Sequence, residues 1–336
     1  MASRLLRLLL LAGGVAVLAI VIARIGPRVI ADMLRRVGWG FLWVSVLYGV
    51  HVAVRAAALW RSLPSPVLRY SQVLRIRLAG EAVEMLTFTG PFLAEPAKAW
   101  LLTRSGVGTP EAFGAIAIEY LLYTIASAWM AAATLGVLLA RDMIPAALHS
   151  GIVAIVVGVI AFTAGCVYAA VRGSGLIVPA IRGAGVLVGQ RRADAAAARV
   201  DPAERVLVSF MHDRPARLAE VLAIEAASHA LLASEIWIVL ASLGVRVELS
   251  TPILFEGAIK FIGVVFFFIP GQLGASEGVY AIVANTLGYA AAAGLAVAFV
   301  RRVRALLVAA VGLVALARTG RTTGPPLAPE RSWRSG

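Results

Sequence analysis

Seven long apolar runs dominate this sequence, and shorter polar stretches rich in arginine separate them. Most of these runs approach or exceed the roughly 20 residues that a helix needs to cross a lipid bilayer. The hydrocarbon core offers the backbone no water to bond with, so such runs form helices. The sequence therefore predicts an all-α polytopic membrane protein, a helix bundle of about seven to nine membrane segments. The apolar runs cover residues 5–23, 40–60, 112–139, 146–170, 218–243, 252–269 and 295–317.

Charge and cysteine content exclude several other classes of protein. Charged residues make up 15% of the chain and the net charge is +13, whereas about 25% of a typical soluble domain is charged. The arginines lie beside apolar runs, where they face an anionic membrane surface rather than nucleic acid. Cys166 is the single cysteine, the four histidines are far apart, and no nucleotide-binding P-loop motif occurs. We therefore expect no metal site, no cofactor and no nucleic-acid partner.

The placement of arginine also predicts the organisation and orientation of the chain. We expect an N-terminal membrane half at 1–171, a cytoplasmic basic linker at 172–216, a C-terminal membrane half at 217–318 and a disordered tail at 319–336. The basic N-terminal run is interpreted as a first membrane anchor rather than a cleaved signal peptide. This pattern predicts a multi-pass protein of the bacterial inner membrane with both termini in the cytoplasm.

Two further apolar segments, 78–102 and 266–289, are interrupted by proline and glycine. The first has breaks at Gly90-Pro91 and Glu95-Pro96, and the second at Pro270-Gly271 and Gly274. Each break is followed by a glutamate, Glu95 or Glu277, and these are 182 residues apart (277 − 95). Broken segments at corresponding places in two halves are typical of transport sites near the bilayer midplane. We therefore predict two re-entrant segments in two pseudo-repeated halves; ordinary interfacial loops with solvated glutamates are the alternative.

Several charged residues lie within the apolar runs, where an unpaired charge is expensive. Glu256 and Lys260 are four residues apart in the favourable order for an ion pair, so we expect them to neutralise each other. Glu225 and His229 share a helix face, which suits either an ion pair or a proton relay. Arg301 and Arg304 share a face, whereas Arg302 does not. The other buried charges expected here are Glu119, Glu235 and the pair of His51 with Arg55, for which a carboxylate partner is expected.

Two stretches of the sequence are similar to a known family. Gly80-Glu81-Ala-Val-Glu84 with the later Glu95-Pro-Ala-Lys98, and Pro270-Gly-Gln-Leu-Gly274-Ala-Ser-Glu277, resemble the flippase-like family of the lysylphosphatidylglycerol synthase transmembrane region. Arg301 resembles an arginine on the last helix of that family. The resemblance extends over about residues 5–317, but Ala94, Tyr120 and Gln272 depart from its pattern. It implies lipid handling without the aminoacyl-transfer domain of the full synthases.

The expected function is translocation of an anionic or phosphate-bearing lipid between leaflets, rather than chemistry on it. The expected partner is a phospholipid or a polyprenyl-type lipid. Two alternatives stay open: an integral-membrane enzyme that modifies a lipid or polyprenyl headgroup, and a non-catalytic membrane partner of a lipid-synthesis enzyme. We assign no catalytic residue and expect Glu277 and Arg301 to face one cavity. The candidate lipid-binding and transport residues are Glu95, Lys98, Pro270, Gly271, Gly274, Glu277 and Arg301, with Glu81, Glu119, Glu225 and His229 as secondary candidates.

Overall fold

The computed structural model of the chain describes residue 28 and residues 35–64, 67–86, 91–265 and 275–319. Within these ranges every regular element is a helix. Four helical stretches are long and apolar enough to cross a membrane: α3 (Trp39–Ser62), α6 (Thr109–Ala140), Ala146–Arg172 and α11 (Pro215–Ser242). The prediction of an all-α polytopic membrane protein is confirmed.

These helices match the predicted apolar runs closely. Ala146–Arg172 comprises η1 (Ala146–Leu148) and α7 (His149–Arg172). The runs at 252–269 and 295–317 correspond to α12 (Ser250–Val265) and α14 (Ala291–Thr319). The first predicted run, 5–23, and most of the predicted tail lie outside the described residues.

The first interrupted segment differs in part from its prediction. It comprises α4 (Tyr70–Leu86) and α5 (Pro91–Arg104), and residues 87–90 between them lie outside the described residues. A proline at the start of α5 is favourable, because its missing N–H has no partner there in any case. The interruption expected at Glu95-Pro96 was wrong: α5 continues through Pro96. A proline within a helix removes one backbone hydrogen bond, and this helix tolerates the loss.

The second interrupted segment comprises α12 and α13 (Ala275–Thr286). Residues 266–274 between them lie outside the described part of the chain. The re-entrant character of both segments therefore stays a prediction, as does the count of membrane segments.

The range predicted as a basic linker is mostly helical. Gly173, with φ 62°, ends α7, and α8 (Ile177–Gly183), α9 (Gly185–Val188) and α10 (Gln190–Asp213) follow. The carboxylate of Glu204 on α10 accepts hydrogen bonds from the N–H groups of Ile177 and Val178 at 2.5 and 2.9 Å. It thereby satisfies donors at the start of α8 that have no partner within the helix.

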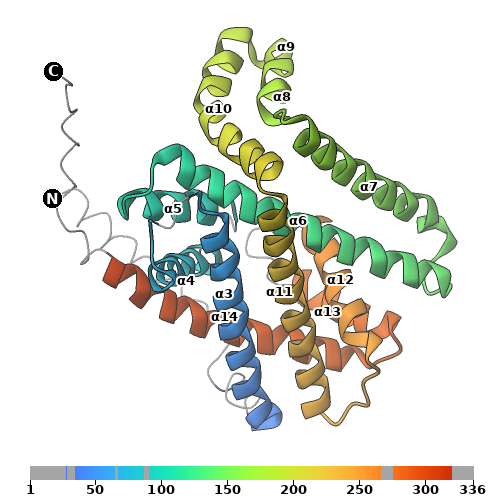
Figure 1. Ribbon diagram of the computed structural model, residues 1–336. Coiled ribbons are helices and arrows are strands. Elements are labelled where there is room, and N and C mark those ends of the chain that lie inside the picture. The colour runs from blue at the N-terminus through green and yellow to red at the C-terminus, as the bar shows by residue number, and fades with distance from the viewer. Residues whose placement is uncertain (1–27, 29–34, 65–66, 87–90, 266–274, 320–336) are drawn as a thin grey trace, which may run out of the picture.

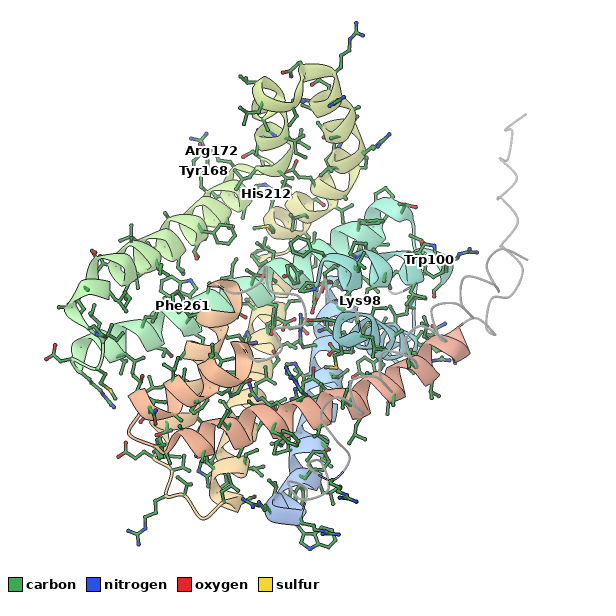
Figure 2. The ribbon with its side chains drawn as sticks, turned by 180° about the vertical axis from the view of Figure 1, so that it is seen from behind. Lys98, Trp100, Tyr168, Arg172, His212 and Phe261 are labelled. Atoms are coloured by element: carbon green, nitrogen blue, oxygen red, sulfur yellow. The ribbon has the colours of Figure 1, made fainter. Side chains whose placement is uncertain are left out.

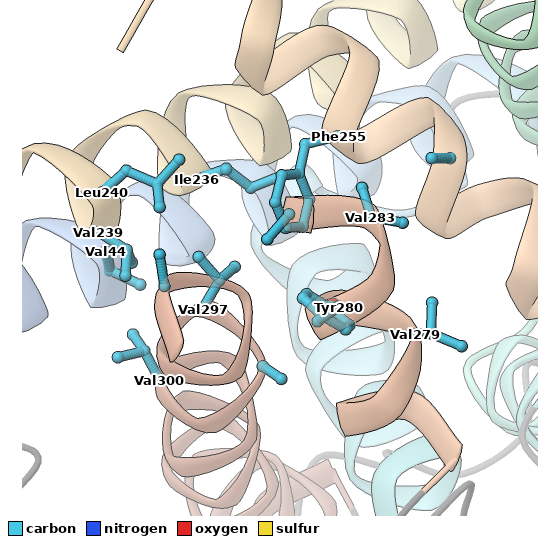
Figure 3. Packing of buried hydrophobic residues seen from close by; sticks show 14 of the residues in the cluster. Val44, Ile236, Val239, Leu240, Phe255, Val279, Tyr280, Val283, Val297 and Val300 are labelled. Atoms are coloured by element: carbon cyan, nitrogen blue, oxygen red, sulfur yellow. The ribbon is translucent and has the colours of Figure 1, made fainter. Parts of the chain in front are cut away.

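Three helix pairs hold the bundle together (Figure 1). α3 lies against α11, α4 against α14 and α6 against α12. The largest apolar cluster joins five helices through Val44, Ile236, Phe255, Val283 and Val297 (Figure 3). Since lipid tails are as apolar as these side chains, close packing rather than exclusion of water holds such helices together.

Candidate functional site: two buried ionic networks

A carboxylate on α6, Glu119, lies at the centre of a first cluster of buried charges. Its Oε1 is 2.5 Å from Nη2 of Arg55 on α3 and 2.9 Å from Nη1 of Arg77 on α4. Its Oε2 is 3.9 Å from Nζ of Lys98 on α5. Figure 2 shows Lys98 in the interior of the bundle, where it is 1% exposed. Cations from three other helices thus converge on one carboxylate.

Each of these three cations also meets a second carboxylate. The pairs are Arg77–Glu81 at 2.8 Å, Lys98–Glu95 at 2.7 Å and Arg55–Glu225 at 3.4 Å. Glu225 belongs to α11, so this cluster reaches into the second half of the chain. We call these seven residues the Glu119 network: Glu119, Arg55, Arg77, Lys98, Glu81, Glu95 and Glu225.

A guanidinium on α14, Arg301, lies at the centre of a second cluster. Its Nη2 is 2.7 Å from Oε2 of Glu256 on α12, and its Nε is 3.2 Å from Oε2 of Glu235 on α11. Arg301 also donates hydrogen bonds to the backbone oxygen of Leu232 at 2.8 Å and to the hydroxyl of Tyr280 at 3.2 Å. Three helices therefore fix the plane of this guanidinium.

Two more cations complete the second cluster. Arg304 donates to Glu235, and Nζ of Lys260 is 3.5 Å from Oε1 of Glu256. We call these five residues the Arg301 network: Arg301, Arg304, Lys260, Glu235 and Glu256.

Tyr123 and Tyr48 join the two networks. The hydroxyl of Tyr123 accepts a hydrogen bond from Lys260 at 2.6 Å, while Cζ of Arg55 lies 3.6 Å from the centre of its ring. The hydroxyl of Tyr48 donates to Glu81 at 2.8 Å, and Cζ of Arg304 lies 3.5 Å from its ring centre. Each tyrosine therefore contacts one cation from each half or a charge from both networks.

A histidine stacks on each of these tyrosine rings. His51 lies 5.1 Å from the ring of Tyr48, and His229 lies 4.7 Å from the ring of Tyr123. His51 contacts the backbone oxygen of Ser228, and His229 contacts the hydroxyl of Ser127. The polar interior is thus continuous from Glu95 to Arg301.

The two networks explain how this bundle tolerates its charges. A single charge at mid-bilayer costs about 2.5–3.5 kcal/mol on insertion scales. Pairing offsets that cost only when the remaining donors and acceptors are also bonded. Ionisable groups inside membrane proteins usually line substrate or ion pathways, so these networks are the candidate functional site.

The structure brings five of the predicted site residues together. Glu81, Glu95, Lys98, Glu119 and Glu225 all belong to the Glu119 network. The sequence named them separately, without the partners that now connect them.

The expected neighbour pairs are more varied than their spacing suggested. Lys260 lies near Glu256 as expected, but Glu256 is closer to Arg301. Glu225 pairs with Arg55, which was expected to have a carboxylate partner, whereas His229 stacks on Tyr123. A shared helix face therefore did not make a pair of Glu225 and His229.

The predicted site in the second interrupted segment is not described. Pro270, Gly271 and Gly274 lie outside the described residues. Glu277 belongs to α13, but its side chain is outside what the structure describes. Its pairing with Arg301 stays a prediction.

Sequence reasoning missed three residues of the site. Arg77 is four residues before Glu81 on one helix, and that spacing indicates an ion pair. Tyr48 and Tyr123 carry no such signal, because a tyrosine in an apolar run reads as part of the core.

The fold and these networks define a polytopic helical membrane protein with a charged interior. The model of the lysylphosphatidylglycerol synthase transmembrane region matches residues 4–312. The chain belongs to this family. Neither a search of curated proteins nor a search of solved structures found a match.

Proposed function

We propose that this protein moves an anionic or phosphate-bearing lipid between the leaflets of the bacterial inner membrane. Its family is named for the membrane region of a lipid-synthesis enzyme, which supports a lipid as the substrate. A charged headgroup cannot cross the hydrocarbon core cheaply. A polar route through the bundle lowers that barrier, and the two ionic networks supply such a route.

One observation carries this proposal: the Arg301 network has more cations than carboxylates among its described side chains. Arg301, Arg304 and Lys260 face only Glu235 and Glu256. Such an excess favours an anionic ligand, which completes the charge balance.

The exposure of these side chains supports the same direction. The side chains of Arg301 and Lys260 are 11% and 19% exposed, whereas those of Glu235 and Glu256 are 1% exposed. The accessible edge of the network is therefore cationic. The planar fork of Arg301 suits two oxygens of a phosphate.

The remaining predicted residues extend this site. The breaks at Pro270, Gly271 and Gly274 create half-helix ends that favour polar ligands. In this proposal Glu277 and Glu95 orient the headgroup or exchange protons with it. The side chain of Glu95 is 14% exposed, the most accessible carboxylate among the ion pairs of its network.

The test is leaflet-resolved transport of phosphatidylglycerol by purified protein in proteoliposomes. Arg301→Lys keeps the charge but loses the fork, so it should retain only weak transport, and Arg301→Ala should retain none. Glu277→Gln should stop transport while lipid binding persists. Arg205→Gln is the matched control, because this side chain on α10 is 75% exposed and belongs to neither network. Transport at the native rate in folded Arg301→Ala and Glu277→Gln would reject this mechanism.

The same vesicles separate this proposal from its alternatives. A transporter leaves the mass of the lipid unchanged, whereas an enzyme acting on the headgroup changes it. Mass spectrometry of the recovered lipid therefore decides between the two. Stable co-purification with a lipid-synthesis enzyme, without intrinsic transport, would instead indicate a non-catalytic partner.

A further inference from the structure

Two sets of four helices, α3–α6 and α11–α14, make corresponding contacts. Within each set the first helix packs on the second, the second on the third, and the third on the fourth. Between the sets, α4 packs on α14 just as α12 packs on α6, and α3 packs on its own counterpart, α11. This is the contact pattern of two repeats related by a twofold axis.

The turns that precede the fourth helices fix a register between the two sets. Gly106 and Gly288 have φ values of 98° and 81°, in the left-handed region. The N–H of Gly106 donates to the oxygen of Thr103 at 3.2 Å, and that of Gly288 to the oxygen of Asn285 at 3.0 Å. Both correspondences have an offset of 182 residues (288 − 106 and 285 − 103).

The first helices have nearly the same offset. α3 ends at Ser62 and α11 at Ser242, while the next helices begin at Tyr70 and Ser250. Both differences are 180 residues (242 − 62 and 250 − 70).

Close helix crossings give the register of the second helices. A Cβ on Gly312 of α14 would lie 2.3 Å from the oxygen of Leu78 on α4. A Cβ on Gly257 of α12 would lie 2.8 Å from the oxygen of Met130 on α6. The offsets are 182 for the fourth helices (312 − 130) and 179 for the second helices (257 − 78).

These offsets superimpose the two ionic networks with their charges reversed. The central Glu119 corresponds to the central Arg301, and each of its neighbours also changes sign. The corresponding residues are Arg55 and Glu235, Arg77 and Glu256, Glu81 and Lys260, and Glu119 and Arg301. The corresponding ion pairs are Arg55–Glu119 with Glu235–Arg301, Arg77–Glu119 with Glu256–Arg301, and Arg77–Glu81 with Glu256–Lys260.

The two repeats run in opposite directions. Gly40 at the start of α3 adjoins Ser242 at the end of α11, and Arg61 near the end of α3 is 2.5 Å from Glu220 near the start of α11. The ends of this α3–α11 seam are about 30 Å apart at 1.5 Å per residue, which matches the hydrocarbon thickness of a bilayer. The twofold axis therefore lies across the helices, as in inverted-topology transporters.

We propose that α3–α6 and α11–α14 are inverted repeats, and that the headgroup passes between Glu119 and Arg301 as the seam opens alternately at its two ends. This rests on the proposed transport function. Inverted repeats place the substrate site at their interface and alternate access by rocking one repeat against the other. Both ends of the seam are in contact here, which corresponds to the closed intermediate.

Contacts between the repeats at the middle of the seam assign positioning residues. Tyr123 meets Lys260, Tyr48 meets Arg304, and Arg55 meets Glu225. These contacts rearrange when the repeats rock, so Tyr48 and Tyr123 position the two networks against each other.

The test measures both ends of the seam with pairs of spin labels in a Cys166→Ala background. One pair replaces Leu42 and Ala241, which are exposed near one end, and the other replaces Arg61 and Glu220. Purified full-length protein is studied in nanodiscs of phosphatidylcholine, with and without phosphatidylglycerol. A pair within α7, at Val153 and Val167, is the control that should not change.

The two distances should each show two populations that shift in opposite directions when phosphatidylglycerol is added. Ends that stay fixed in both lipids, or that widen together, would overturn the proposal.

A second measurement links this motion to transport. A short bismaleimide bridge across Arg61→Cys and Glu220→Cys should reduce lipid transport to the level of protein-free vesicles, while alkylation of either single cysteine should not. Native transport with the bridge formed would also overturn the proposal. If wild-type protein moves no lipid, the transport function fails, and opposite movement of the two ends would still support inverted repeats.

Discussion

Replacing Glu119 by glutamine tests whether this carboxylate holds the first network together. The substitution keeps the shape and one acceptor oxygen but removes the charge that Arg55, Arg77 and Lys98 share. Removing one partner of a buried ion pair typically costs about 3–5 kcal/mol.

The structure places Glu119→Gln at the lower end of that range. Each of the three cations keeps a second carboxylate, between 2.7 and 3.4 Å away, so none is left entirely without a counter-charge. We therefore expect a loss of about 3 kcal/mol in the free energy of unfolding.

Glu220→Gln is a control with the same ion-pair distance and different burial. Arg61 and Glu220 are 2.5 Å apart, like Arg55 and Glu119, but their side chains are 33% and 41% exposed. Exposed pairs are worth about 0–1 kcal/mol, so this variant should remain close to the wild type.

The assay is reversible unfolding in mixed micelles by added dodecyl sulfate, followed by circular dichroism. The double variant Arg55→Gln/Glu119→Gln should be more stable than the sum of the single losses predicts, because coupled residues deviate from additivity by about 0.5–3 kcal/mol. The reasoning fails if Glu119→Gln is no more destabilising than Glu220→Gln.

Three further changes have distinct expected outcomes. Tyr123→Phe removes the hydroxyl that accepts from Lys260 and should lower stability by about 1 kcal/mol, measured in the same unfolding assay. Gly312→Ala should separate α4 from α14 and lower the thermal midpoint, whereas Gly158→Ala should leave it unchanged because a Cβ there meets nothing within 4 Å. A reporter fused at Gly189 should lie in the cytoplasm if the orientation by arginine is right; a periplasmic signal there would contradict it.

The all-helical fold could be predicted from the sequence because the bilayer imposes it. Apolar runs long enough to cross a membrane have few alternatives to a helix, and the boundaries of α6 and α11 fell close to the predicted ones. The expected break at Pro96 failed because a proline signal reports a local preference, which a helix in a packed bundle can override.

The candidate site was predictable only one residue at a time. A charge in an apolar run is visible in the sequence, so Glu119 and Arg301 were named. Their partners come from helices far along the chain: Arg55 is 64 residues from Glu119, and no periodicity connects them. Only spacings within one helix, such as Arg77 with Glu81, could have been found earlier.

The relation between the two networks was hidden for a different physical reason. A comparison of the halves looks for similar residues, and arginine opposite glutamate counts as a mismatch. An ion pair, however, needs one partner of each sign and works equally well when both signs are exchanged. Two repeats can therefore keep the same pairs of positions while every charge in them is reversed. Reversal also places an anionic centre beside a cationic one across the seam, which stabilises the closed bundle and leaves each repeat with a charge that a headgroup can meet when the seam opens.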